Sequence, residues 1–262
     1  MRDYRAEAEK RATWIQETIR DADAKGVIFG NSGGKDSALV GILCKIAAEL
    51  GAKGSPSFSV LGIIMPCGAA ANYGTDLEHA ELLARVFGID SAIVDLTPCK
   101  DALTRELLKA AKITSVASAN ISPRLRMTTL YALGQSHGYL VAGTSNKSEY
   151  YTGYFTKWGD GAYDFNPIAD LLATEVFEFL QYLGAPAEII GKPPSAGLFE
   201  GQTDEDEMGV SYAVLDKFIQ TRDGHTLLGA SRCESASLDT DKIRRMHSKT
   251  VHKRQPPKMY GG

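Results

Sequence analysis

Cysteine is scarce in this sequence. The 262 residues contain only four, with no Cys-x-x-Cys pair and no regular spacing between them. This excludes a disulfide-stapled secreted scaffold and a zinc site built on paired cysteines, and it predicts a reducing, cytoplasmic setting. A chain of this length needs no such staples, because folding buries about 70–75% of the surface that its unfolded form exposes.

The sequence also lacks the apolar segments of exported and membrane-spanning proteins. Residues 1–25 are polar and amphipathic and contain no apolar core of a signal peptide. Elsewhere, glycine, proline or a charge interrupts each apolar run well before the roughly 18 residues that a membrane helix needs. We therefore expect no targeting segment and no membrane partner.

Positive charge is not in excess. Lys+Arg 29 against Asp+Glu 32 gives a net charge of −3, with an isoelectric point near 6.0. This balance argues against a broad basic surface for nucleic acid, so we expect no nucleic-acid partner. Any charged ligand must therefore be bound in a local pocket of opposite charge.

Short β-branched runs alternate with helical patterns through the first half of the chain. This alternation is typical of an α/β fold with an open, doubly wound parallel sheet, which is Rossmann-like and has helices on both faces. No internal repeat and no low-complexity tract interrupts it. The expected strands are residues 27–30, 59–65, 91–96 and 139–143, the expected helices are residues 37–50, 76–87, 99–112 and 123–137, and residues 51–57 form a connecting loop.

The second half has longer irregular segments, which in a compact domain are often functional. An acidic run at residues 204–207 follows the second of two expected loops, and the basic tail at 252–262 is expected to be extended. We predict one domain over residues 1–262, with a core at about 20–190 and substrate-binding lid segments at about 151–166 and 191–262. The elements expected here are loops at 151–166 and 191–202 and helices at 174–183, 212–220 and 237–250.

The sharpest motif is Gly-Asn-Ser-Gly-Gly-Lys-Asp-Ser at residues 30–37, directly after the first expected strand and before the first expected helix. Glycines there let backbone N–H groups approach an anion, and the helix N-terminus adds partial positive charge. The spacing is neither Walker A nor G-x-G-x-x-G. An ordinary strand-to-helix turn with a capped helix is the alternative, but the whole octet in this position favours a phosphate site.

A second motif covers residues 143–161, after the fourth expected strand. Thr144 and Glu149 should lie at the carboxyl edge of the sheet, where open α/β sheets bind ligands. Glu149 can then share a Mg²⁺ with Asp36, because Mg²⁺ is usually held by one or two carboxylates plus phosphate oxygens. Taken singly, these residues could equally belong to a solvated loop.

Residues 32–37 resemble the pyrophosphate loop of the N-type ATP pyrophosphatases, which include GMP, asparagine, argininosuccinate and tRNA-lysidine synthetases. Residues 143–161 are similar to the G-T-x-x-x-x-E-x-x-x-G-[FY]-x-T-K-x-G-D-G stretch of the ammonia-dependent NAD synthetases. Further motifs match in order at 124–127, 166–167, 194–198, 202–205, 207–209 and 252–254. The resemblance covers nearly the whole chain.

The resemblance implies an adenine nucleotide alpha-hydrolase-like fold and a ligase that amidates nicotinic acid adenine dinucleotide (deamido-NAD). ATP and ammonia would be co-substrates, Mg²⁺ the cofactor, and the assembly a homodimer with the dinucleotide site near its interface. Lys35 and Asp36 would be catalytic, and Asp36 and Glu149 would hold the metal. The implied ATP-binding residues are Gly30, Asn31, Ser32, Gly33, Gly34, Lys35, Asp36, Ser37, Thr144 and Ser195; those for deamido-NAD are Arg124, Lys157, Asp164, His252 and Lys253.

Two positions depart from the family pattern. Asn31 stands where an aliphatic residue is usual, a mild change in a loop built on backbone contacts. Ala173 stands where a lysine typically reaches the ATP phosphates, so this sequence lacks one of the family's positively charged contacts with the phosphates. Two alternatives therefore stay open: another N-type ATP pyrophosphatase, or a weakened nucleotide-binding homologue. We expect ammonia, not glutamine, as the nitrogen source, because no segment has the length or the activated cysteine of an amidase domain.

Overall fold

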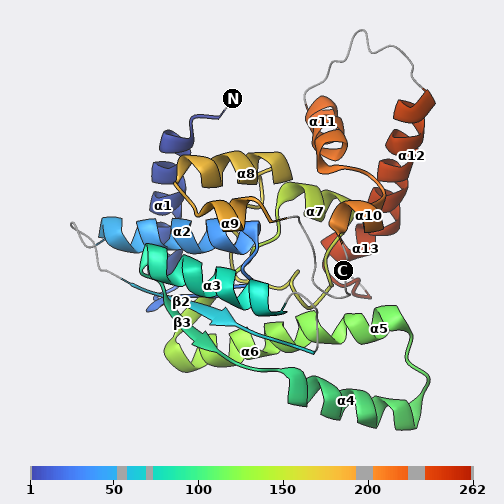
Figure 1. The fold of residues 1–262 in the computed structure, drawn as a ribbon, viewed down its shortest axis with the longest axis horizontal. Helices are drawn as coiled ribbons and strands as arrows, with labels where there is room; N and C mark the ends of the chain where they lie inside the picture. Colours follow the sequence, from blue (N-terminus) through green and yellow to red (C-terminus); the bar gives the residue numbers. More distant parts are fainter. Residues whose placement is uncertain (1, 52–57, 69–72, 193–202, 224–233, 261–262) are drawn as a thin grey trace.

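Four parallel strands form the sheet, in the spatial order β3-β2-β1-β4. The computed structural model describes residues 2–51, 58–68, 73–192, 203–223 and 234–260 (Figure 1). The register pairs Gly30 with Ile63 and Phe29 with Ala142, so the carboxyl ends of β1, β2 and β4 meet at one edge. The strands are β1 Gly26–Gly30, β2 Ser59–Ile64, β3 Asp90–Ile93 and β4 Tyr139–Ala142.

Helices cover both faces of this sheet, which confirms the predicted fold class. Val27 and Phe29 of β1 pack into the larger apolar cluster with α1, α2 and α8, whereas the intervening Ile28 faces α6 on the other side. A strand buried on both faces needs a continuous apolar run, which is what Val27–Phe29 supplies. The helices of this part are α1 Tyr4–Asp21, α2 Lys35–Gly51, α3 Tyr73–Phe87, α4 Thr97–Ala110, α5 Ser115–Ala119, α6 Ile121–His137, α7 Lys147–Thr152, α8 Ala173–Tyr182 and α9 Ala187–Ile190.

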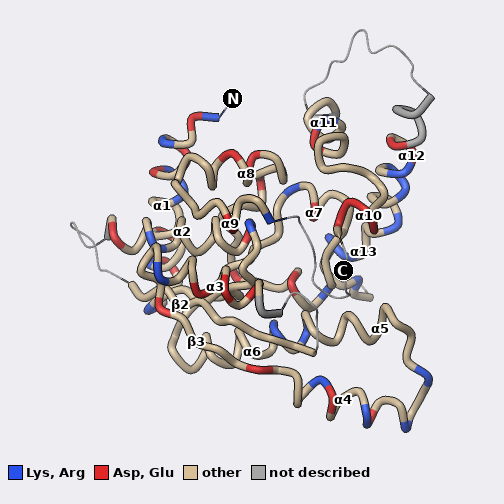
Figure 2. The backbone as a smooth tube through the Cα atoms, viewed as in Figure 1, with Lys and Arg blue, Asp and Glu red and all other residues tan. Residues whose placement is uncertain are grey.

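A second apolar cluster joins the C-terminal helices to the end of α7 and the start of α8. Leu215 and Ile219 of α11 pack with Ile243 of α12 and with Leu172. Figure 2 shows acidic residues gathered on α10 and basic residues along α12. These helices are α10 Asp204–Met208, α11 Tyr212–Asp223, α12 Glu234–Lys249 and α13 Val251–Arg254.

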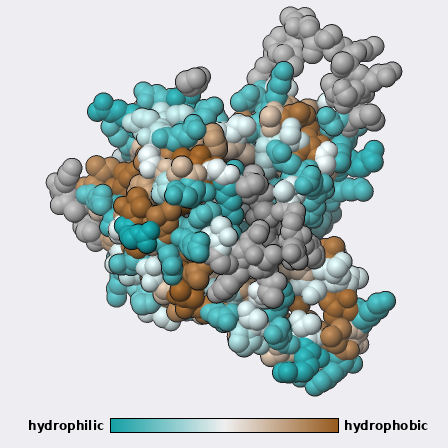
Figure 3. All heavy atoms as spheres, viewed as in Figure 1, coloured by the Kyte–Doolittle hydropathy of each residue, from teal (hydrophilic) through white to brown (hydrophobic). Residues whose placement is uncertain are grey.

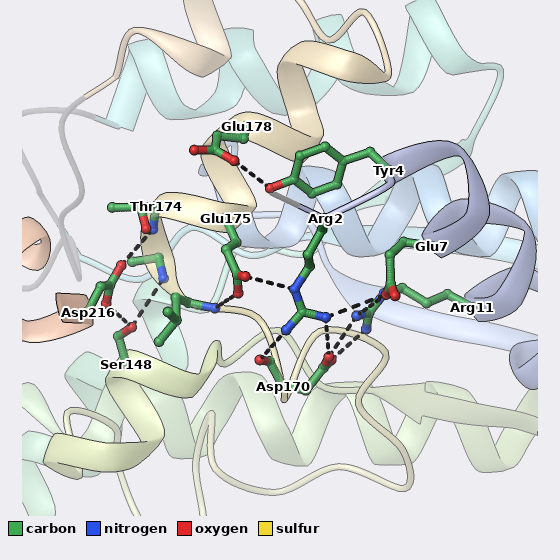
Figure 4. A network of polar contacts seen from close by, with 12 residues as sticks. Arg2, Tyr4, Glu7, Arg11, Ser148, Asp170, Thr174, Glu175, Glu178 and Asp216 are labelled. Atoms are coloured by element: carbon green, nitrogen blue, oxygen red, sulfur yellow. Dashed lines mark hydrogen bonds and ion pairs between the residues drawn. The ribbon is translucent and has the colours of Figure 1, made fainter. Parts of the chain in front are cut away.

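An ion-pair network connects α1 and the residues before it to the N-terminal end of α8 (Figure 4). The buried Arg11 binds Asp170 at 2.6 Å and Glu7 at 2.7 Å, and Arg2 binds Glu175 of α8 at 2.7 Å. Arg11 also donates to the carbonyl oxygen of Pro167. The segment that leads from β4 into α8 is thus held by the first helix, which lies outside the core predicted to begin near residue 20.

The tail is where the structure contradicts the sequence prediction. Residues 252–254 are not extended but belong to the helix Val251–Arg254, because Arg254 and Lys253 donate to carbonyl oxygens of the segment 151–155 and hold a last turn in place. Most of the two expected loops at 51–57 and 191–202 lies outside the described residues. The division into a core and lid segments stays a prediction. Within the described ranges, no helix is both long and apolar enough to cross a membrane.

Candidate active site

The glycine-rich loop lies where the sequence predicts it, between β1 and α2. Gly33 has φ +69°, and a Cβ at this position would lie 2.3 Å from the carbonyl oxygen of Asp76. Only glycine combines this left-handed backbone with so close an approach. Because α2 begins at Lys35, its first turn presents free N–H groups and a positive dipole end to any anion on the loop.

Asn31 is tied into the protein rather than free on the loop. Its side chain is 1% exposed, and its Nδ2 donates to the carbonyl oxygen of Ala80 on α3 over 2.9 Å. Its Oδ1 accepts from Gly33 N at 3.4 Å. An aliphatic residue could make neither bond, so in this chain the side chain at position 31 fixes the loop against α3.

Asp36 and Glu149 meet through Asn146, a residue that the sequence analysis missed. Asn146 Nδ2 donates to Asp36 Oδ1 at 2.9 Å, while Asn146 N donates to Glu149 Oε2 at 3.1 Å. Asn146 Oδ1 in turn accepts from Glu149 N at 3.0 Å, which completes a capping box at the start of α7. The spacing Asn-x-x-Glu before a helix is a readable sign of such a cap.

The charges around this pair favour a cation. Burial raises the pKa of Glu149 well above its ordinary value, and the nearby Asp36 carboxylate raises it further. Burial also raises the pKa of Asp36, although the bond from Asn146 and the charge of Lys35 oppose the shift. Asp204 of α10 is 4% exposed and adds a third negative charge that acts on both. The sequence analysis gave Asp204 no role at the site, because α10 approaches the loop only in the folded chain.

The donor set suits Mg²⁺ bound together with a phosphate ligand. No group of three or more His, Cys, Asp or Glu that could hold an ion occurs in the described part of the chain. Asp36 and Glu149 each accept a hydrogen bond from Asn146 through one carboxylate oxygen. Mg²⁺ is commonly held by one or two carboxylates plus substrate phosphates, so these residues fit that ion better than a resident ion held by protein alone.

A cavity of about 480 Å³ connects these groups. Most of the phosphate loop lines it, together with Thr144, Glu149 and Asp204. Its size is within the range of small-molecule sites. The structure thus brings the predicted loop, Thr144 and the two carboxylates predicted to bind a metal to one cavity. Ser195, the other predicted ATP contact, lies outside the described residues.

Four of the five residues assigned to deamido-NAD form a basic group beside this cavity. Lys157 Nζ donates to the carbonyl oxygen of His252 at 2.6 Å, and Arg124 Nη2 donates to that of Lys157 at 3.3 Å. Lys253 donates to the carbonyl oxygens of Gly153 and Phe155 at 2.8 and 2.7 Å. A smaller cavity of about 240 Å³ is lined by Lys157 and Lys253, and Lys253 also lines the large one.

Asp164, the fifth residue, has other partners. Its Oδ2 accepts from Val141 N at 2.8 Å and its Oδ1 accepts from Tyr131 Oη at 3.2 Å. Neither cavity has Asp164 in its lining. Its role in substrate binding stays a prediction, and in this structure its carboxylate fixes the edge of β4.

Asp216 of α11 holds α7 and α8 together (Figure 4). Its Oδ2 accepts from Thr174 N at 2.9 Å, and its Oδ1 accepts from the hydroxyl of Ser148, the residue before Glu149. Ser148 Oγ also accepts from Ala173 N at 3.1 Å. Ala173 is partly buried against the second apolar cluster and does not line the large cavity.

The family model and similar curated proteins point to the same family. The family described as NAD synthase matches residues 7–257. The NH(3)-dependent NAD(+) synthetase of Carboxydothermus hydrogenoformans is 43% identical over 98% of this chain and 97% of its own, and that of Finegoldia magna is 41% identical over 98% and 96%.

Solved structures agree with this. The NMN synthetase of Francisella tularensis superposes with a TM-score of 0.85 at 32% identity, covering 100% of both chains. The NH3-dependent NAD synthetase of Campylobacter jejuni has a TM-score of 0.79 at 28% identity, covering 99% of both. With a family match over almost its whole length and the phosphate loop and carboxylate pair in one cavity, the chain belongs to the NAD synthase family.

Proposed function

We propose that this protein is an ammonia-dependent NAD synthetase, which amidates deamido-NAD at the expense of ATP. The observation that carries the proposal is one cavity that joins the glycine-rich loop at 30–37 to the Asp36–Glu149 pair and to Lys253 of the basic group. A phosphate site, a carboxylate pair for a cation and a cationic pocket are what the reaction of ATP with a carboxylated dinucleotide requires.

The reaction runs in two steps. An oxygen of the nicotinate carboxylate forms a bond to the α-phosphorus of ATP, and the bond from that phosphorus to the bridging oxygen breaks and releases pyrophosphate. Ammonia then attacks the acyl carbon, AMP leaves with the electrons of the C–O bond, and the nitrogen loses a proton to give the amide. No covalent bond to the protein forms.

The protein contributes alignment and charge. The loop amides and the start of α2 receive the phosphates that become pyrophosphate, and Lys35 adds a positive charge there. Burial lowers the pKa of Lys35, while the charges of Asp36 and Asp204 oppose that shift. Asp36 and Glu149 would hold Mg²⁺, which neutralises charge on the departing pyrophosphate when it is bound.

The test is a comparison of nitrogen sources and products. Purified protein with ATP, Mg²⁺ and deamido-NAD should form NAD, AMP and pyrophosphate in equal amounts with ammonium chloride, and far more slowly with glutamine. The rate should rise toward alkaline pH, because only unprotonated ammonia is a nucleophile. Equal rates with glutamine would reject the ammonia assignment, and pyrophosphate release independent of the dinucleotide would favour another ATP pyrophosphatase or a weakened homologue.

A mononucleotide substrate is the second candidate. It is favoured by the 32% identity and TM-score of 0.85 to the Francisella tularensis protein described as an NMN synthetase. Both activities require the same ATP chemistry and differ in how much of the basic group the substrate contacts. The ratio of kcat/KM for deamido-NAD and for nicotinic acid mononucleotide decides between them.

A homodimer is the assembly we propose, in the cytoplasmic setting predicted from the sequence. Apolar side chains are exposed along α4 and α5, with Leu108 59% and Val116 67% exposed, and α4 buries no residue at all. Hydrophobic atoms are visible over these helices in the space-filling view (Figure 3). A patch of this kind suits a protein interface, and twofold dimers are the commonest assembly. Sedimentation of the fully active species as a 28.3 kDa monomer would reject the dimer.

A further inference from the structure

Arg126 of α6 is a cation in the large cavity to which the proposed function gives no task. It is half-buried, and it lines the cavity with Pro123 and Leu130, which lie on the same face of the helix. Its Nε donates to the carbonyl oxygen of Met65 at 3.1 Å. Across the described ranges, its two Nη atoms have no hydrogen bond and no carboxylate forms an ion pair with it.

Among the described residues, the buried Arg11 has carboxylate partners, whereas Arg126 has none. Arg11 is 9% exposed and pairs with both Asp170 and Glu7, as expected for a guanidinium taken out of water. Arg126 also loses hydration, and burial lowers its pKa, but a guanidinium keeps its charge in proteins. Within the described residues, the four N–H donors on Nη1 and Nη2 therefore have no protein acceptor, and the side chain lines the cavity, where an anionic ligand would satisfy them.

The position of Arg126 indicates which part of the ligand it would contact. Leu130, one turn further along α6, lies 3.7 Å from where a Cβ on Gly30 would be, at the start of the phosphate loop. In the other direction, Pro123 lies 3.0 Å from where a Cβ on Gly159 would be. The charge of Asp160, in the same loop, acts on both Arg126 and Lys253. Arg126 thus lies between the phosphate loop and the segment that carries the basic group.

In the proposed reaction, the α-phosphate of ATP must lie between these two regions. Its β- and γ-phosphates belong at the loop, whereas the carboxylate that attacks it arrives from the side of Lys253. We propose that Arg126 is a catalytic residue that binds the non-bridging oxygens of the α-phosphate through Nη1 and Nη2 while the carboxylate attacks. This inference rests on the proposed function.

The chemistry balances without a proton transfer by Arg126. The new O–P bond forms as the P–O bond to pyrophosphate breaks, and negative charge grows on the equatorial oxygens in between. A planar fork of donors aimed at those oxygens stabilises that charge, and its effect should be larger in the transition state than in bound ATP. Losing Arg126 should therefore lower kcat more than it raises the KM for ATP.

The test uses Arg126→Lys, Arg126→Gln and Arg126→Ala in the full chain, with Arg85→Ala as the matched control on the exposed end of α3. Two rates are measured: NAD formation, and exchange of labelled pyrophosphate into ATP with deamido-NAD present and ammonia absent. We expect Arg126→Gln to lower both rates by about 10²–10³-fold, as loss of one oxyanion donor does, with a KM for ATP that changes far less. Arg126→Lys should fall between, since it keeps the charge and a donor for Met65 but loses the fork.

Chemical rescue separates catalysis from structure. Millimolar methylguanidinium should restore part of the exchange rate of Arg126→Ala and have no such effect on the wild type or on Arg85→Ala. Wild-type exchange rates in Arg126→Gln would overturn the inference, as would a loss in Arg126→Ala that methylguanidinium leaves unrestored and that accompanies a lower melting temperature. An inactive wild-type protein would instead reject the proposed function, so the two failures are distinguishable.

Discussion

Asn146 donates a hydrogen bond to Asp36 over 2.9 Å across 110 positions of sequence. Through this bond the N-cap of α7 is joined to the first turn of α2. One residue holds both carboxylates: the side-chain amide of Asn146 donates to Asp36 and its backbone N–H donates to Glu149. Both carboxylates therefore have a defined direction before any cation arrives, which is the condition for binding an ion without reorganisation.

Replacing Asn146 should weaken the response to Mg²⁺. Asn146→Ala removes the bond to Asp36 and the cap of α7, and loss of such a supporting residue typically costs about 10–100-fold in metal affinity or activity. Asn146→Ser is the matched variant, because it keeps a cap for Glu149 N but is too short to reach Asp36. A Mg²⁺ titration of NAD formation should show a raised half-activating concentration in both variants; an unchanged titration in Asn146→Ser would contradict the role of this bond.

The two carboxylates should behave as one unit. Asp36→Asn and Glu149→Gln should each reduce turnover strongly while the melting temperature stays close to that of the wild type, because both side chains lie at the carboxyl edge of the sheet and not in the core. If they serve a single ion, the double variant should be little worse than either single one. A double-mutant cycle on kcat/KM measures this, and fully additive losses would argue for separate roles.

Removing the carboxylate of Asp216 should destabilise the fold. Asp216→Ala leaves Ser148 Oγ and Thr174 N without their buried acceptor, and an unpaired buried donor costs about 1–3 kcal/mol. The free energy of unfolding in urea should fall by about that amount or more. Lys217→Ala, at an exposed position next along α11, is the control and should change it by no more than about 0.5 kcal/mol. Equal stability of the two variants would refute the assignment.

The network at Asp170 should make stability depend on acid pH. Burial alone would raise the pKa of Asp170, but the hydrogen bonds and charge of Arg11 and the charge of Arg2 outweigh it, so the folded-state pKa is lowered. A lowered pKa adds stability above the unfolded-state value of about 3.9, and this is lost as the pH falls through the folded-state pKa. The side chain is 55% exposed, so the effect should be on the order of 1 kcal/mol.

Asp170→Asn tests this directly. Its free energy of unfolding should lie below that of the wild type at pH 7, and the difference should shrink as the pH falls below about 4, where the wild-type carboxylate is itself protonated. Urea denaturation at a series of pH values measures the gap. Asp101→Asn, on the exposed face of α4, is the control and should follow the wild type throughout. A gap that stays constant down to pH 2 would contradict the ion-pair explanation.

Local signals account for what the sequence by itself determined. The apolar run Val27–Phe29 and the glycines at 30, 33 and 34 lie within a few residues of one another. The first strand, the phosphate loop and the start of α2 could therefore be predicted from the hydrophobic pattern and from the backbone freedom of glycine. The α/β class follows from the same alternation. The positions of Asp36 and Glu149 at one sheet edge also follow, since each comes a few residues after the end of a strand and parallel strands end together.

Only the tertiary structure decided which distant groups meet. Asp204, Asp216 and Arg126 are separated from the loop by scores of residues. The motifs at 124–127 and 202–205 contain two of them, but no sequence pattern shows which groups these side chains meet. The last turn at Val251–Arg254 likewise exists because carbonyl oxygens of the segment 151–155 accept hydrogen bonds from Lys253 and Arg254. The basic, proline-bearing sequence of the tail does not by itself favour a helix. Side chains of this kind acquire their roles from burial and from partners that folding brings within hydrogen-bond distance, and those depend on the packing of the whole chain.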